Sequence, residues 1–385
     1  KDLKIASARM NELAALKRVD FANMFPQATA LLNGNRETTN YGGDNFDADS
    51  ELSLTASISW ELDLWGNLRW ARDRSTAEFL ASVENCRAVK MGLVAQVAQS
   101  YFELMALDNE LAIVRRTLEA RREGVRLAEI RFKGGLTSEI VFQQAKVELA
   151  KTATMVPDLE RRISLKESEI ALLTGDFPYA VNRNILPEEI QLPNALPLGL
   201  PSTLLERRPD IRKAERELMA AHAEVGLAYT NMFPRLALTA TLGTESETLR
   251  DFLKSPYSYL AGNLLSPLFA MGKNRAALKA KRAAYEGAVA EYEQTVLTAF
   301  KETHDAIINF NKIKDIYESR RQLAEASRTA VELAQLQYIN GVIGYLDLLD
   351  AQRNYFDAQV SLSNAVCNKQ LMIINLYKAL GGGWK

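Results

Sequence analysis

The chain has 385 residues, of which 47% are hydrophobic and 25% charged, as in folded proteins and unlike disordered ones. Its 47 Lys and Arg residues nearly balance 48 Asp and Glu residues, so its charge favours no nucleic-acid partner. Cys86 and Cys367 are too few for a disulfide scaffold or a cysteine-built zinc site. No apolar run approaches the roughly 18 to 20 residues of a membrane helix, and the first residues do not resemble a signal peptide.

Proline placement predicts two long helical regions separated by an irregular one. No proline lies between Pro26 and Pro157 or after Pro267, so uninterrupted helices can form there. The segment 176–209, by contrast, is rich in proline, which predicts loops and short elements.

The two helical regions also match each other in sequence. The Asn-Met-Phe-Pro run that ends at Pro26 recurs with its end at Pro234, and the glycines of the first region have counterparts in the second. A shared register over most of the chain indicates a duplicated unit. We expect a first repeat over 1–175, an equatorial or linker region over 176–209, and a second repeat over 210–385.

Each repeat is expected to begin with a helix and to continue with two strands. Residues 51–65 alternate between apolar and small polar side chains, which is the pattern of a strand with two different faces. A weaker alternation follows Pro234. The expected strands are about 26–40, 51–65, 234–245 and 257–269.

The apolar period then changes to about three and a half residues, which is typical of helices that pack lengthwise. We expect long helices over 67–133 and 273–339, each on the order of 100 Å long at about 1.5 Å per residue. Antiparallel return helices are expected over 137–173 and 345–380. Glycines at the two reversals can adopt the positive φ that such a turn needs.

Residues 51–65 are long enough to cross a bilayer, which takes about 9 to 11 tilted strand residues. Four strands cannot close a barrel, for which about eight are needed, and unpaired edges in lipid are costly. A membrane-spanning sheet would therefore require several chains in one barrel. The alternative is a half-buried strand of a soluble sheet, although no compact domain for it to pack against is evident.

Several runs resemble one known family. Trp60-Glu-Leu-Asp-Leu-Trp-Gly66, Arg207-Arg-Pro-Asp-Ile211 and Leu348-Leu-Asp-Ala-Gln-Arg353 are similar to motifs of the TolC-like outer-membrane efflux proteins. The end of the chain resembles the lipoprotein (NodT-like) branch that serves resistance-nodulation-division pumps. The resemblance implies a mixed, mainly α fold with an internal two-fold repeat. Long antiparallel helical hairpins would form a periplasmic α-barrel, and four strands per chain would join a trimeric 12-stranded transmembrane β-barrel.

The same resemblance implies an outer-membrane channel of a tripartite efflux system for drugs and toxic solutes, a passive duct gated at its periplasmic tip. The implied partners are two further copies in a homotrimer, a periplasmic adaptor (membrane fusion) protein, an inner-membrane pump and outer-membrane lipid, with an N-terminal lipid anchor upstream of this sequence. We expect no enzymatic activity and no cofactor, because no phosphate loop or nucleophile motif occurs. The alternatives are an outlet for type I protein secretion, a soluble coiled-coil scaffold and a pore-forming toxin.

By the resemblance, Asp350 corresponds to the aspartate of the periplasmic aperture, and Asp347 lies three residues before it on a similar helix face. Rings of carboxylates repel anions and collect cations, whereas the alternative is a solvated face favoured by the helix dipole. Tyr338 matches a tyrosine that ties the long helix to its neighbour in the closed state of some relatives. Val141 and Ile343 replace the usual carboxylate and arginine, so the closing network must differ.

The two hairpin tips are expected to contact the adaptor. The glycines could be present only because the turns require them. Apolar side chains at an exposed tip, however, indicate a surface that binds a partner. The expected contact residues are Gly134, Gly135, Leu136, Thr137, Asn340, Gly341 and Val342.

Other notable side chains are interpreted as structural. The basic residues of the segment 115–133, among them Arg121 and Arg131, alternate with glutamates, which predicts a solvated, ion-paired face. His222 and His304 are isolated from other ligand residues, so we expect no metal site. The two cysteines are expected to pack between helices.

Overall fold

The computed structural model describes residues 1–39, 47–183, 206–247, 251, 254–267 and 270–382. This part of the chain is mainly helical with one small antiparallel sheet, as expected. No helix within it combines the length and apolar character needed to cross a membrane. The helices are α1 (Asp2–Ala22), α2 (Asn67–Lys133), α3 (Glu139–Thr174), α5 (Pro209–Thr230), α6 (Lys273–Ile339) and α7 (Tyr345–Ala379), and the strands are β1 (Gln27–Thr39), β2 (Asp47–Leu62), β3 (Arg235–Ser246) and β4 (Pro256–Leu265).

Contacts between residues divide the chain into two compact units. The sheet unit comprises residues 4–86 and 209–296, and the tip unit comprises residues 1–3, 87–208 and 297–385. Helices α2 and α6 contribute residues to both units. Each unit draws on both halves of the sequence, so neither unit coincides with one of the two expected repeats.

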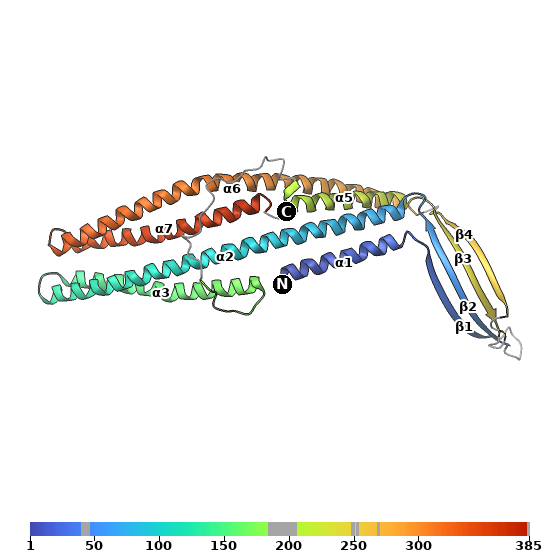
Figure 1. Ribbon diagram of the computed structural model, residues 1–385, viewed down its shortest axis with the longest axis horizontal. Coiled ribbons are helices and arrows are strands. Elements are labelled where there is room, and N and C mark those ends of the chain that lie inside the picture. Colours follow the sequence, from blue (N-terminus) through green and yellow to red (C-terminus); the bar gives the residue numbers. More distant parts are fainter. Residues whose placement is uncertain (40–46, 184–205, 248–250, 252–253, 268–269, 383–385) are drawn as a thin grey trace. The chain divides into compact units, whose positions relative to one another are not determined.

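In the sheet unit the strands are ordered β1-β2-β3-β4, and every neighbouring pair is antiparallel (Figure 1). Ser59 is paired with Gln27 on one side and Thr239 on the other. Because directly paired residues share a face, these side chains define a polar face of the sheet. The next pairs, which join Ile58 to Ala240, define an apolar face.

The two faces differ in their chemistry. On the polar face, hydroxyl groups bond across the strands: Thr29 to Ser57 at 2.8 Å, and Thr55 to the Tyr257 hydroxyl at 3.4 Å. On the apolar face, large side chains remain exposed in the single chain. They include Leu32, Leu54, Ile58, Leu238, Leu242, Leu260 and Leu264.

Strand β2 begins earlier and ends earlier than the expected range 51–65. It ends at Leu62 because the carboxylate of Asp63 accepts the backbone N–H groups of Leu68 and Arg69, both at 3.0 Å, which caps the start of α2. Strand β4 likewise ends at Leu265 rather than 269, and residues 40 and 268–269 of the expected strands lie outside the described residues.

Helices α2 and α6 cover the ranges expected for the two long helices. In the tip unit, α2 and α3 form one antiparallel hairpin, and α6 and α7 form another (Figure 1). Burial of the apolar stripe of α2 against α3 forms the main core of this unit. The core residues are Leu104, Leu107, Leu111, Val114, Leu159, Ile163, Ile170 and Val181.

Candidate functional site

The two hairpins of the tip unit end in turns with the same hydrogen-bond pattern. In the first, Gly135 N–H donates to the Phe132 carbonyl at 2.9 Å, and in the second, Gly341 N–H donates to the Tyr338 carbonyl at 3.1 Å. Both glycines have positive φ, 70° and 73°, where a side chain would be strained. The apolar residues that follow, Leu136 and Val342, are 77% and 71% exposed.

Asp347 and Asp350 lie in the first two turns of α7, and both are exposed. The Asp347 carboxylate accepts the backbone N–H of Gly344 at 3.0 Å, so it also stabilises the start of the helix. Within the described ranges, the Asp350 carboxylate accepts one local bond, from the Asn354 amide at 3.2 Å. The two aspartates line a hollow of about 790 Å³ between α6 and α7.

Tyr338, near the end of α6, is only 5% exposed. The guanidinium group of Arg131 in α2 lies over its ring, 4.6 Å from the centroid, and donates to the carbonyl of Ile339 at 3.2 Å. The Tyr338 hydroxyl is buried and has no hydrogen-bond partner among the described residues. Tyr338 therefore contacts the other hairpin through its ring, by a cation–π interaction.

A buried carboxylate also joins the two hairpins. Glu148 of α3 and Arg121 of α2 have side chains only 6% and 7% exposed, and their charged groups are 3.6 Å apart. Arg353 of α7 donates to the same carboxylate, its Nε at 3.2 Å and a terminal nitrogen closer still. Arg121 also donates to Gln352 of α7 at 3.0 Å.

These contacts shift the pKa values of Glu148 and Arg121. The hydrogen bond from Arg353, reinforced by the charge of Arg121, holds the pKa of Glu148 below its ordinary value despite burial of the carboxylate. Burial lowers the pKa of Arg121, and the nearby Glu148 charge partly offsets this effect. The resulting network is a charged link between α7 and the first hairpin.

The interpretation of the basic segment 115–133 is wrong for two of its members. Arg115, for example, forms an exposed ion pair with Glu160 at 2.8 Å, as expected. Arg121 is buried, however, and Arg131 covers Tyr338. The association of Arg121, Glu148 and Arg353 was therefore not predicted from the sequence.

His222 and Cys367 pack against neighbouring residues, whereas His304 is exposed. The His222 ring lies 5.6 Å from Trp70 and 5.7 Å from Tyr285. Cys367 is buried, and burial raises the pKa of its thiol to about 11. Within the described ranges, no group of three His, Cys, Asp or Glu side chains is arranged to hold a metal ion.

The model of the outer membrane efflux protein family matches residues 1–176 and 200–382 of the chain. The chain belongs to this family. The solvent efflux pump outer membrane protein SrpC of Pseudomonas putida is 32% identical over 393 aligned positions, which cover 100% of this chain and 83% of SrpC. The outer membrane protein OprJ of Pseudomonas aeruginosa is 33% identical over 381 positions, 95% of this chain and 78% of OprJ. A crystal structure of CusC matches with a TM-score of 0.92 at 28% identity and covers 100% of this chain and 89% of that one.

Family membership assigns the protein to the outer membrane as an efflux channel. Family membership favours the channel over the soluble coiled-coil scaffold, the alternative that belongs to a different functional class. The family is one of transport proteins rather than of enzymes.

Proposed function

We propose that three copies of this chain form a passive exit duct of a tripartite efflux system for drugs and other toxic solutes. Each copy would supply its four strands to a 12-stranded outer-membrane barrel, and its helices to a periplasmic α-barrel built on a two-fold internal repeat. The observation that carries this proposal is the sheet, which exposes an apolar face and ends at β1 and β4, strands with one unpaired edge each within the described chain. Pairing with neighbouring copies would satisfy these edges in lipid.

The gate of the duct would lie at the start of α7. Three copies of Asp350 and Asp347 around the duct axis would form carboxylate rings that select for cations and narrow the aperture. Tyr338 would hold α6 against the first hairpin through Arg131, 4.6 Å from its ring centroid. Because the Val141 side chain offers no acceptor, this ring contact would be the link that the Tyr338 side chain makes to the first hairpin.

The link through Glu148 would set the position of α7. Movement of α7 away from α2 and α3 would separate Arg353 from Glu148 and leave that buried carboxylate with fewer partners. Such a separation is unfavourable unless another interaction compensates for it. We infer that contact with the periplasmic adaptor supplies this compensation, and that the inner-membrane pump supplies the energy of transport.

The adaptor would bind the two hairpin tips, where Leu136 and Val342 are exposed. Both turns place an apolar side chain directly after a positive-φ glycine, so two similar surfaces are presented by each chain. The contact residues would be Gly134, Gly135, Leu136, Thr137, Asn340, Gly341 and Val342.

Single-channel recording in a planar bilayer tests the proposal. We expect the wild-type protein to conduct, and Asp350→Ala to raise the conductance and reduce the preference for cations. Asp315→Ala removes an exposed carboxylate of α6 that pairs locally with Lys312 and should change neither property. Absence of current from both the folded wild type and the Asp350 variant would contradict the proposal that the protein is a channel. Identical currents and ion preferences in all three proteins would contradict the role of Asp350 in the gate.

A further inference from the structure

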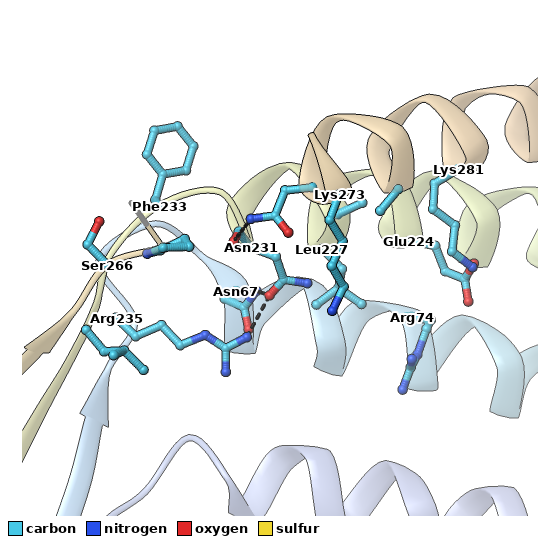
Figure 2. Close-up of a pocket in the computed structure, with 15 residues that line it drawn as sticks. Asn67, Arg74, Glu224, Leu227, Asn231, Phe233, Arg235, Ser266, Lys273 and Lys281 are labelled. Carbon is cyan, nitrogen blue, oxygen red and sulfur yellow. Dashed lines mark hydrogen bonds and ion pairs between the residues drawn. The ribbon is translucent and has the colours of Figure 1, made fainter. Parts of the chain in front are cut away.

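A second cavity, separate from the gate, lies in the sheet unit. Its volume is about 840 Å³, within the roughly 300 to 1,000 Å³ of small-molecule sites. It is lined where strands meet helices: by the first residue of β3, the last of β4, the first residues of α2 and α6, and the end of α5. Figure 2 shows the side chains that surround it.

The strand register determines on which side of the sheet the cavity opens. Arg235 pairs with Leu265, and both line the cavity. Arg235 lies four residues before Thr239, so it shares the polar face of the sheet, whereas Leu236 belongs to the apolar face. In the proposed duct the cavity would therefore open toward the lumen rather than toward lipid.

Positive charge predominates around the cavity. Its lining contains four cationic side chains and one carboxylate, Glu224. Lys281 pairs with Glu224, and Arg74 pairs with Asp20 outside the cavity at 3.5 Å. Arg235 and Lys273 form no ion pair in the described part of the chain, so two positive charges are left without a carboxylate.

A neutral amide holds Arg235 in place. The Asn231 side-chain oxygen accepts hydrogen bonds from Arg235 at 2.7 Å and from Asn67 at 3.0 Å (Figure 2). The Asn231 carbonyl accepts a further bond from the Asn274 amide at 3.5 Å. The guanidinium group is thus positioned without being neutralised, which lowers the entropic cost of binding an anion.

The remaining wall of the cavity is mainly apolar, apart from Ser266. It includes Leu227, Phe233 and Pro267, and the Phe233 ring is supported by Trp65, which stacks on it at a centroid distance of 5.0 Å. Two unopposed cations beside a rigid apolar wall fit a ligand with an acidic group on an apolar body.

We propose that this cavity binds anionic amphiphiles, small molecules that carry a carboxylate, sulfonate or phosphate on an apolar body, as solutes passing through the duct. Arg235 and Lys273 bind the acidic group, and the wall around Phe233 contacts the apolar body. The lumenal position rests on the proposed duct, whereas binding by the folded protein does not depend on it.

Calorimetric titration with taurocholate, with the protein in an uncharged detergent, tests the binding. We expect Arg235→Gln combined with Lys273→Gln to weaken binding at least about tenfold, because two charge-assisted contacts are lost. Arg275→Gln combined with Lys279→Gln removes two exposed cations of α6 that do not line the cavity and should leave the affinity unchanged. Equal affinity in all three proteins would overturn the proposal.

A charge-conserving variant distinguishes the loss of charge from a folding defect as the cause of weaker binding. Arg235→Lys combined with Lys273→Arg should bind taurocholate within about threefold of wild type, since both charges remain. A loss of binding as large as that of the glutamine variant would show that the charges are not what binds the ligand, and would count against the site. Phosphatidylglycerol that co-purifies with the protein and is not displaced by taurocholate would also overturn the proposal, because a lipid headgroup would then occupy the cavity.

Bilayer recordings separate this inference from the channel itself. Taurocholate should reduce the current of wild type but not of the glutamine variant. A wild type that conducts, with taurocholate affinity independent of Arg235 and Lys273, would refute the cavity and leave the duct intact. Affinity that depends on these residues in a protein that never conducts would refute the duct and leave the cavity intact.

Discussion

The indole ring of Trp70 in α2 lies against the backbone of Gly226 in α5, so closely that a Cβ atom at position 226 would come within 2.3 Å of the ring. His222, one turn earlier in α5, meets the same indole edge-on with the centroids 5.6 Å apart. The close approach of the two helices therefore depends on the absence of a side chain at position 226.

Gly226→Ala should destabilise the protein. Alanine favours a helix over glycine by about 0.5 to 1 kcal/mol, but displacement of the Trp70 ring should cost about 1 to 3 kcal/mol. Thermal unfolding followed by circular dichroism should show a lower midpoint. Gly287→Ala in α6 is the control, because a Cβ atom there would meet nothing within 4 Å, and its midpoint should rise slightly. A Gly226 variant as stable as the Gly287 variant would disprove this packing argument.

Glu148→Ala should loosen the link between the two hairpins. It would leave Arg121 buried without its carboxylate, a change that typically costs about 3 to 5 kcal/mol. Hydrogen–deuterium exchange should become faster in α3 and α7 around this position. Glu160→Ala removes the partner of Arg115 in a pair whose side chains are 60% and 50% exposed, and should cost less than about 1 kcal/mol. Similar exchange in both variants would argue against the buried link.

The contribution of Glu148 should depend on pH. Its pKa is lower in the folded protein than its ordinary value, which is about 4.3 for a glutamate. The stabilisation is therefore complete above pH of about 5, and is lost as the pH falls through the folded-state pKa. The difference in melting midpoint between wild type and Glu148→Gln should be largest at neutral pH and shrink in strong acid. A difference that does not change with pH would contradict the assignment.

Tyr338→Phe should be tolerated. The Tyr338 hydroxyl is buried without a partner in the described chain, so its removal should be neutral or stabilise by up to about 1 to 3 kcal/mol. The phenyl ring still lies under Arg131. Tyr338→Ala removes the ring as well and should destabilise by about 3 to 5 kcal/mol. Thermal midpoints would distinguish these outcomes, and a strong loss of stability in the Phe variant would reveal a partner for the hydroxyl.

The long helices were predictable because their apolar period continues without proline, and the structure has α2 and α6 over the ranges expected. Strand ends were less predictable: the alternation of apolar side chains runs on past Leu62, but Asp63 turns to cap α2. The spacing of apolar residues does not indicate a local hydrogen bond of this kind.

Part of the buried network at the tips could have been predicted from the sequence. Arg121 lies seven residues after Val114 and seven before Ala128, and all three are buried. This spacing continues the core stripe of α2, so it could have identified Arg121 as buried in spite of its charged neighbours. Its partner Glu148 and the second arginine of that carboxylate, Arg353, lie on other helices, and no sequence motif joins them.

The hydroxyl pairs on the polar face of the sheet affect how solutes would move along it. Thr29 bonds to Ser57, and Thr55 bonds to Tyr257. Each of these bonds uses one of the two hydroxyl protons in its pair, so one donor and several acceptor sites of the pair remain for water. A wall of this kind would stay wetted and could exchange hydrogen bonds with water and solutes alike, so it would not exclude polar cargo.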